Sequence, residues 1–190
     1  MRIVTGSLKG RVIPFTSRRH GDVRITASRL RESLFATLGA DLDATAFLDL
    51  CAGTGQMAIE AASRGARTVA AEPDRRRYES LKKLVAEWKV EGMELTNSRA
   101  ENLIDRLGER GEEFDGIFID PPYDATNSGE PLSVVLLRRI DETGLCAPGG
   151  LVAVQHSKRL EHPERSGSLH LQRQRKFGDS LLSLYELESA

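Results

Sequence analysis

The sequence predicts a single α/β domain built around a mostly parallel sheet. Short apolar strand patterns alternate with amphipathic helix patterns from residue 46 to residue 155, which is typical of βαβ units. The length of 190 residues fits one domain with one core. Hydrophobic residues make up 39% of the chain and charged residues 29%, a composition typical of globular proteins rather than disordered chains.

The first 45 residues are predicted to form a small hairpin and one helix. We expect strands over residues 2–5 and 11–15 around a glycine turn, a polar loop over residues 16–25, and a helix that begins near Thr26 and ends at Gly39. Leu30, Leu34 and Leu38 recur at a spacing of four, so they lie on one side of this helix.

The alternation of strands and helices then continues to the end of the chain. We expect strands at residues 46–51, 68–72, 93–97, 114–120 and 151–155, helices at residues 55–64, 74–90, 100–107 and 131–143, and a final pair of strands at residues 169–175 and 180–187. Parallel sheets bind ligands at the carboxyl ends of their strands. The chemistry is therefore expected to follow Cys51, Glu72, Asn97 and Asp120.

The composition excludes several classes of protein. No stretch approaches the roughly 18 apolar residues that a membrane span requires, and the N-terminus lacks the apolar core of a signal peptide. Cys51 and Cys146 do not make a disulfide framework, and the four histidines lie far from them without ligand spacing. We therefore expect a reduced, cytoplasmic protein without a metal site. The sequence leaves the oligomeric state open, and a monomer is our working expectation.

The charge of the chain is unevenly distributed. The formal net charge is −1, from 27 Lys and Arg against 28 Asp and Glu. Residues 1–31 nevertheless carry eight basic side chains and one acid, a net charge of +7. Basic segments of this kind often contact phosphate backbones. A solvated face on a small hairpin would show the same composition, so charge alone leaves both interpretations open.

The first candidate site is a glycine-rich turn after the strand at residues 46–51. It reads Asp49-Leu50-Cys51-Ala52-Gly53-Thr54-Gly55, and its glycines allow a tight turn and a close approach of the backbone to a ligand. The run also fits the loose dinucleotide-binding pattern, and it could simply permit helix–strand packing. Asp49 favours a ligand with a cationic amine, such as S-adenosylmethionine, over a pyrophosphate, because like charges repel.

The second candidate is Glu72, at the end of the next strand. An acid at this position can accept hydrogen bonds from both ribose hydroxyls. NAD enzymes and methyltransferases share the feature, so it indicates an adenosine ligand without choosing between the two classes. An acid near the start of the following helix would look the same.

The third candidate is Asp120-Pro121-Pro122-Tyr123, after an apolar strand. Two prolines stiffen the backbone and hold a carboxylate, a carbonyl and an aromatic ring in a fixed relation. Asp120 and the Pro121 carbonyl can accept the two N–H groups of an exocyclic amine, while Tyr123 stacks on the base. The two acceptors stabilise the positive charge that grows on the nitrogen during attack. A proline-rich turn without chemistry is the alternative.

Together these three sites resemble class I S-adenosylmethionine-dependent methyltransferases that act on an exocyclic amino group. The wider chain is similar to the bacterial 16S rRNA guanine-N2 methyltransferases, through the opening MRIVTGSLKGRVI and the run RITASRLRESLF at residues 24–35. This resemblance implies a Rossmann-like sheet of seven strands with an antiparallel last strand. It implies a basic hairpin arm over residues 1–25, and a catalytic core over residues 26–190 of the same domain.

The same resemblance implies one methyl transfer to N2 of a guanine in 16S rRNA, in the small ribosomal subunit or its assembly intermediate. Catalytic roles fall to Asp120, Pro121, Pro122 and Tyr123. Contacts with S-adenosylmethionine fall to Asp49, Ala52, Gly53, Thr54, Gly55, Glu72, Ser98, Arg99 and Ala100. Contacts with rRNA phosphates fall to Arg2, Lys9, Arg11, Arg24, Arg29 and Arg31.

Arg99 departs from the family pattern, in which relatives usually carry an acid that accepts the adenine amino group. Arginine cannot accept a hydrogen bond, so main-chain groups near Ser98 and Ala100 are expected to bind adenine instead.

Three other functions compete with this interpretation: an adenine-N6 methyltransferase of DNA or RNA, a nicotinamide-dependent oxidoreductase and a non-catalytic RNA-binding protein. The oxidoreductase leaves the Asp-Pro-Pro-Tyr run without a role.

Overall fold

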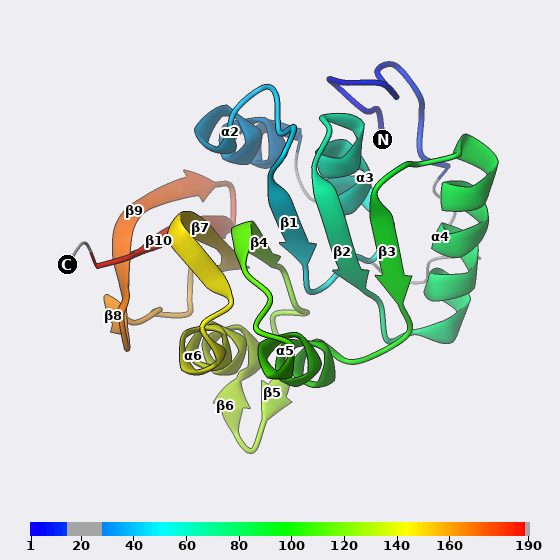
Figure 1. The fold of residues 1–190 in the computed structure, drawn as a ribbon. Helices are drawn as coiled ribbons and strands as arrows, with labels where there is room; N and C mark the ends of the chain where they lie inside the picture. Colours follow the sequence, from blue (N-terminus) through cyan, green and yellow to red (C-terminus); the bar gives the residue numbers. More distant parts are fainter. Residues whose placement is uncertain (15–27, 189–190) are drawn as a thin grey trace. The chain divides into compact units, whose positions relative to one another are not determined.

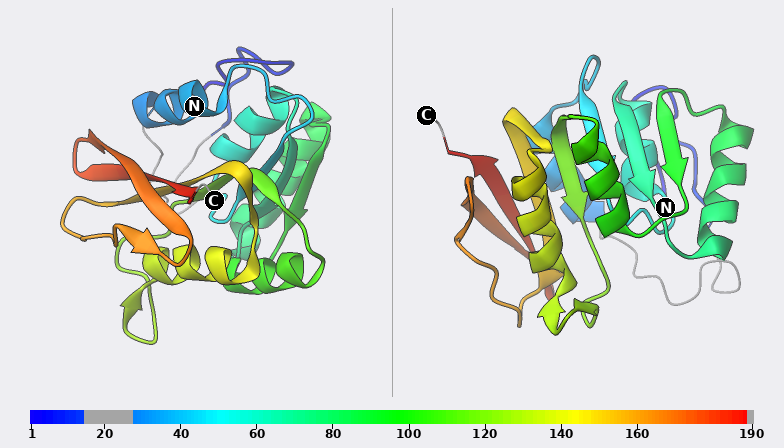
Figure 2. Two further views of the ribbon diagram at one scale, coloured as in Figure 1. Left: turned by 60° about the vertical axis from the view of Figure 1, so that its left-hand side comes forward. Right: turned by 60° about the horizontal axis from the view of Figure 1, so that its bottom comes forward.

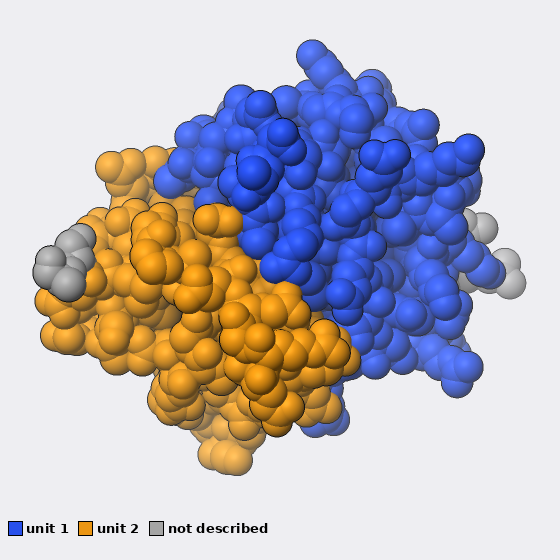
Figure 3. Space-filling view, viewed as in Figure 1, with its two compact units in different colours: residues 1–100 blue, residues 101–190 orange. Residues whose placement is uncertain are grey.

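The computed structural model describes residues 1–14 and 28–188 of the chain. These residues form two compact units, Met1–Ala100 and Glu101–Ala190 (Figure 3). The predicted loop at residues 16–25, the helix start at Thr26 and the predicted phosphate contact Arg24 lie outside the described residues. No helix in the two described ranges is long and apolar enough to cross a membrane. The organisation as one domain stays a prediction.

The first unit contains three parallel strands with β2 in the middle (Figure 1). The strands are β1 (Ala46–Asp49), β2 (Arg67–Ala71) and β3 (Met93–Thr96), and the helices are α2 (Ser28–Leu38), α3 (Gln56–Ser63) and α4 (Arg75–Trp88). Helix α3 packs on β1 and β2, and its small residues Ala58 and Ala61 are fully buried, which allows this close packing. Asp74 caps the start of α4 by accepting a hydrogen bond from the main-chain N–H of Arg77.

The N-terminal segment, residues 1–14, belongs to the core of the first unit. Its two halves are joined by a single antiparallel bridge between Arg2 and Val12, so within residues 1–14 the predicted hairpin is present as one bridge and not as the two expected strands. Ile3, Leu8 and Ile13 are buried against residues of α3 and α4. The expectation of an arm distinct from the core is therefore corrected for these residues, because their apolar side chains form part of that core.

The second unit contains β4 and β7 in parallel, followed by antiparallel strands (Figure 2). Its elements are α5 (Ala100–Glu109, which begins with the last residue of the first unit), β4 (Phe114–Ile119), β5 (Thr126–Asn127), β6 (Glu130–Pro131), α6 (Leu132–Thr143), β7 (Cys146–Ser157), β8 (Arg165–Ser166), β9 (Leu169–Phe177) and β10 (Ser180–Leu187). Strand β10 lies between β7 and β9 and is antiparallel to both. Helix α6 packs on β4 and β7.

The predicted α/β class, with mostly parallel strands and antiparallel strands at the end of the chain, is confirmed. Seven strands of four or more residues occur in the described ranges, three in the first unit and four in the second. The short strands β5, β6 and β8 were not predicted, because two residues are too few to show an alternating pattern. Strand β7 begins five residues before the predicted position, and its pairing with β4 shifts register between Phe114 and Gly116.

Candidate functional site

The glycine-rich turn after β1 is held tightly against the end of β2. Asp49 is 1% exposed and accepts a hydrogen bond from the Cys51 N–H at 3.2 Å. The Ala52 N–H donates to the Ala71 carbonyl at 2.9 Å, which ties the turn to the neighbouring strand. The turn therefore has a fixed shape before any ligand binds.

Two residues of this turn require glycine. Gly53 and Gly55 have φ values of +54° and +79°, in the left-handed region that favours glycine. A side chain on Gly55 would also collide with Leu81 of α4. The Thr54 hydroxyl, which is buried, lies 3.8 Å from the Met1 sulfur, so the N-terminal segment reaches the turn. No sequence pattern indicated this contact.

Glu72 links the turn to the end of β2. It is 3% exposed, and its carboxylate accepts hydrogen bonds from the Gly53 N–H at 2.9 Å, the Asp74 N–H at 2.8 Å and the Arg77 Nε at 3.0 Å. A carboxylate has about four acceptor positions, so these three donors leave it able to accept a further hydrogen bond. Burial raises the pKa of Glu72, and the Asp74 N–H and the Arg77 charge oppose that rise. The predicted ribose contact is therefore chemically available, and Arg77 is an unpredicted neighbour of the site.

The affinity for S-adenosylmethionine should fall as the pH is lowered from 7. The fall should begin at a higher pH than the pH at which a solvent-exposed glutamate becomes protonated. Burial raises the pKa of Glu72 above its usual value of 4.5, so the carboxylate becomes neutral at a higher pH and accepts hydrogen bonds from ribose less well. Calorimetric titrations between pH 7.5 and pH 4.5 measure this effect. The Glu72→Gln variant should bind more weakly at pH 7 and lose most of the pH dependence. A wild-type affinity that is constant over this range would contradict the ribose contact.

The side-chain amide of Asn97 connects the turn after β3 to the main chain at Glu72. The sequence had suggested no role for this amide. The Asn97 Nδ2 donates to the carbonyls of Glu72 and Pro73 at 2.8 and 3.0 Å. The Ser98 hydroxyl oxygen is buried and has no hydrogen-bond partner among the described residues. Arg99 is exposed, whereas Ala100 is buried at the start of α5. The structure thus places these predicted adenine contacts in the turn and helix start that follow β3, the strand paired with β2.

The Asp-Pro-Pro-Tyr run in the second unit forms an open corner after β4. Asp120 and Tyr123 are half-buried, Pro121 is buried and Pro122 is exposed. The Ala125 N–H donates to the Pro122 carbonyl at 3.0 Å and closes the turn. The Tyr123 hydroxyl donates to Ser180 Oγ at 2.6 Å, so the far end of the ring is anchored to β10. Asp120 and Tyr123 are therefore only half-buried rather than sealed inside the core, as a base-binding role requires.

Most of the predicted phosphate contacts that the structure describes lie on the surface. Arg2, Lys9, Arg11 and Arg29 are exposed. Arg11 lies over the Trp88 ring, with 5.4 Å between its guanidinium carbon and the ring centroid. These positions leave the cations open to a polyanion.

Arg31 is the exception among the predicted phosphate contacts. It is 3% exposed, donates to the Arg2 carbonyl at 3.0 Å and lies 3.9 Å from a Glu60 carboxylate oxygen. Its burial lowers the pKa of the guanidinium, and the negative charge of Glu60 opposes this. The predicted phosphate contact is therefore corrected for Arg31, which stabilises the fold instead.

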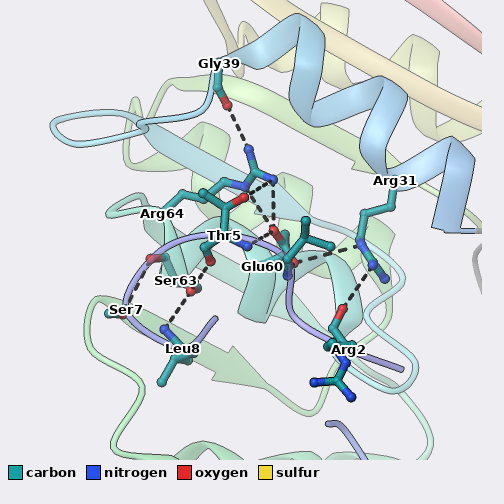
Figure 4. Close-up of polar contacts among 10 residues, drawn as sticks. Arg2, Thr5, Ser7, Leu8, Arg31, Gly39, Glu60, Ser63 and Arg64 are labelled. Atoms are coloured by element: carbon teal, nitrogen blue, oxygen red, sulfur yellow. Dashed lines mark hydrogen bonds and ion pairs between the residues drawn. The ribbon is translucent and has the colours of Figure 1, made fainter. Parts of the chain in front are cut away.

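Glu60 of α3 is the centre of the contacts that hold the N-terminal segment (Figure 4). Its buried carboxylate accepts hydrogen bonds from the Val4 N–H at 2.8 Å, the Thr5 N–H at 3.1 Å and the Arg64 guanidinium at 2.9 Å. One helical turn further on, the Ser63 hydroxyl donates to the Thr5 carbonyl at 2.6 Å and accepts from the Leu8 N–H at 2.9 Å. These contacts fix the segment that carries Arg2 and Lys9.

Comparison with known proteins connects these features to a family. The family described as Conserved hypothetical protein 95 matches residues 1–186. The putative rRNA methyltransferase YlbH of Bacillus subtilis is 30% identical to the chain, and the match covers 98% of each protein. Ribosomal RNA small subunit methyltransferase D of Escherichia coli K12 is 27% identical, with 100% of this chain and 91% of the relative covered.

The fold agrees with the sequence match. The solved structure of the putative methyltransferase yhhF from Escherichia coli has a TM-score of 0.83 with this chain at 27% identity, and the comparison covers 100% and 99% of the two chains. The resemblance to rRNA methyltransferases and the class I methyltransferase fold are thereby confirmed. On both sequence and structure, the chain belongs to the Conserved hypothetical protein 95 family.

Proposed function

We propose that the protein transfers one methyl group from S-adenosylmethionine to N2 of a guanine in 16S rRNA. The observation that carries this proposal is the Asp-Pro-Pro-Tyr corner at the end of β4, where Asp120 and Tyr123 are half-buried and the tyrosine ring is anchored through its hydroxyl. The names of the relatives support the class of reaction and the ribosomal substrate.

The first unit provides the features that S-adenosylmethionine requires. Gly53 and Gly55 adopt the left-handed backbone conformation that the tight turn needs. Asp49 supplies a negative charge for the ammonium group, and Glu72 has acceptor capacity for one ribose hydroxyl. The buried Ser98 hydroxyl offers a polar group near the predicted adenine position. When bound, S-adenosylmethionine supplies an electrophilic methyl group on a positively charged sulfur.

The second unit provides the features that an exocyclic amine requires. The lone pair of such an amine is delocalised into the ring, so the nitrogen is a poor nucleophile. Asp120 and the Pro121 carbonyl would accept its two N–H groups, favour a tetrahedral nitrogen and stabilise its developing positive charge. Tyr123 would hold the base plane by stacking. Asp120 would also take the proton that the methylated amine releases, and no covalent intermediate is needed.

Alignment of the nitrogen with the methyl group and sulfur supplies most of the expected rate enhancement. Positioning of this kind lowers a barrier by roughly 7–11 kcal/mol. The target guanine must leave its stack to reach the corner, which requires the RNA strand to be held beside it. The exposed cations Arg2, Lys9, Arg11 and Arg29 would contribute phosphate contacts.

Product analysis tests the proposal. The protein is incubated with methyl-labelled S-adenosylmethionine and small-subunit particles from cells that lack it, and the RNA is then digested to nucleosides. We expect the label in N2-methylguanosine at about one methyl group per particle. Label in N6-methyladenosine would show that the target base is adenine and not guanine, since the same corner can bind the adenine amine. No label in the RNA would reject the function.

A further inference from the structure

A second cationic surface lies in the second unit, outside the N-terminal segment. Its members are Lys158 and Arg159 after β7 and Arg173, Arg175 and Lys176 on β9; we call these five residues the hairpin surface. Along β9, Arg173 and Arg175 lie on one face of the strand and Lys176 lies on the other. Residues 157–159 and 173–180 together carry these five cations and one acid, Asp179, which leaves a net charge of +4. Every phosphate contact expected from the sequence lies within residues 1–31, so this surface was not predicted.

The members of the hairpin surface next to the β9–β10 turn lie close together. The Lys158 N–H donates to the Asp179 carbonyl at 2.9 Å, and the Lys158 ammonium forms an ion pair with the Asp179 carboxylate. The hydrogen bond from Lys158, with the charges of Lys158, Arg159 and Lys176, lowers the pKa of Asp179. These cations therefore surround a single carboxylate that cannot neutralise them all.

Three members of the hairpin surface are available to a partner. Arg159, Arg173 and Lys176 are exposed, and none forms an ion pair within 4.0 Å among the described residues. By contrast, Arg138 and Arg139 of α6 pair with Glu130 and Asp105. Within the described part of the chain, the positive charge of these three residues is thus not neutralised by an ion pair, whereas the charges of Arg138 and Arg139 are.

The hairpin surface adjoins the Asp-Pro-Pro-Tyr corner within the second unit. Strand β4 pairs with β7 so that Ile119 lies opposite Val154, which places Asp120 level with the last residues of β7. Ser180 follows Asp179 directly and accepts the hydrogen bond from the Tyr123 hydroxyl at 2.6 Å. Ser180, which anchors the ring, is therefore the first residue of β10, directly after the turn that contains Asp179.

We propose that the hairpin surface binds phosphates of the rRNA strand that flank the target nucleotide. This inference rests on the proposed function, because it assigns the surface to the substrate of the same corner. Phosphate contacts fix the register of a nucleic acid without reading its sequence. A base taken out of its stack reaches the corner only if the strand on either side is held nearby. Strand pairing with β10 fixes the backbone positions of Arg173 and Lys176 on β9.

The test replaces three cations of the hairpin surface that have no structural partner. The triple variant Arg159→Gln, Arg173→Gln and Lys176→Gln keeps Lys158, which fixes the turn. The matched control, Arg110→Gln, Arg138→Gln and Arg139→Gln, removes the same charge from arginines of the second unit that already pair with carboxylates. Affinities for a labelled protein-free 16S rRNA transcript are measured at several salt concentrations, with the affinity for S-adenosylmethionine as the check on folding.

We expect the triple variant to bind the transcript more weakly at low salt and to show a shallower salt dependence. Each lost phosphate contact lowers the slope of log affinity against log salt by about 0.7, so three contacts lower it by about 2. On small-subunit particles the KM for the RNA should rise while kcat stays close to the wild-type value. The control should match the wild type in both measurements.

Other results would overturn one proposal or the other. If the wild type methylates particles and the triple variant equals the control in slope and KM, the hairpin surface does not bind RNA and the proposed function stands. If the KM of the variant for particles rises but its affinity for protein-free rRNA equals that of the control, the surface contacts a ribosomal protein and the phosphate proposal is wrong. If the slope falls but the wild type methylates no RNA, the proposed function is wrong and the RNA-binding surface stands.

Discussion

Replacing Asp120 with alanine should lower the rate of methyl transfer to small-subunit particles by about 10²- to 10³-fold. Removing one group that stabilises developing charge in an active site typically has an effect of this size. Asp120 would accept an N–H of the target amine and offset its growing positive charge, and alanine can do neither. The affinity for S-adenosylmethionine should stay within about twofold, because the predicted cofactor contacts lie on other residues. Single-turnover rates and calorimetric titration separate the two effects.

Two further variants make the Asp120 result specific. Asp120→Asn keeps an acceptor oxygen but loses the charge, so its rate should lie between those of the wild type and the alanine variant. Asp124→Ala removes an exposed carboxylate four residues further on and should leave the rate nearly unchanged. Near-normal turnover by Asp120→Ala would refute the role assigned to the corner.

Replacing Glu60 with alanine should destabilise the protein by about 3–5 kcal/mol. Breaking a buried charged network by removing one partner has an effect of this order, because the remaining groups stay buried without partners. Here the main-chain N–H groups of Val4 and Thr5 and the guanidinium of Arg64 would lose their acceptor. At about 2–4 °C per kcal/mol for a protein of this size, the melting temperature should fall by roughly 10 °C. Thermal and urea unfolding measure the change.

The exposed Glu87 of α4 supplies the control for Glu60. Glu87→Ala removes the same side chain from a solvent-facing helical position, where the expected change is within about 0.5 kcal/mol. Glu60→Gln retains one acceptor oxygen and should be less destabilising than Glu60→Ala. If Glu60→Ala unfolds at the same denaturant concentration as Glu87→Ala, the carboxylate does not hold the N-terminal segment.

The sequence was most informative where local patterns and packing agree. Strand β2 was predicted at residues 68–72 and lies at Arg67–Ala71, because an apolar run between two helical patterns has few other ways to be buried. The open corner at Asp120 was also expected, since two prolines after a buried strand impose a turn. The positive φ of Gly55 agrees with the tight turn that its position predicted.

Interactions between residues distant in sequence could not be predicted from local patterns. Arg31 looked like a surface cation, but Glu60 lies 29 residues further along the chain and is brought beside it by the packing of α2 and the N-terminal segment. The bond between Tyr123 and Ser180 joins residues 57 positions apart, and no spacing rule indicates it. Arg77 was likewise missed, because a helical arginine normally faces solvent.

A crystal structure of the protein with S-adenosylhomocysteine and a guanosine-containing RNA tests the assigned chemistry most directly. We predict that the guanine N2 lies within about 3 Å of both the Asp120 carboxylate and the Pro121 carbonyl, stacked on Tyr123 and in line with the cofactor sulfur. A guanine bound with N2 directed away from Asp120, or a cofactor sulfur on the opposite side of the base from N2, would contradict it.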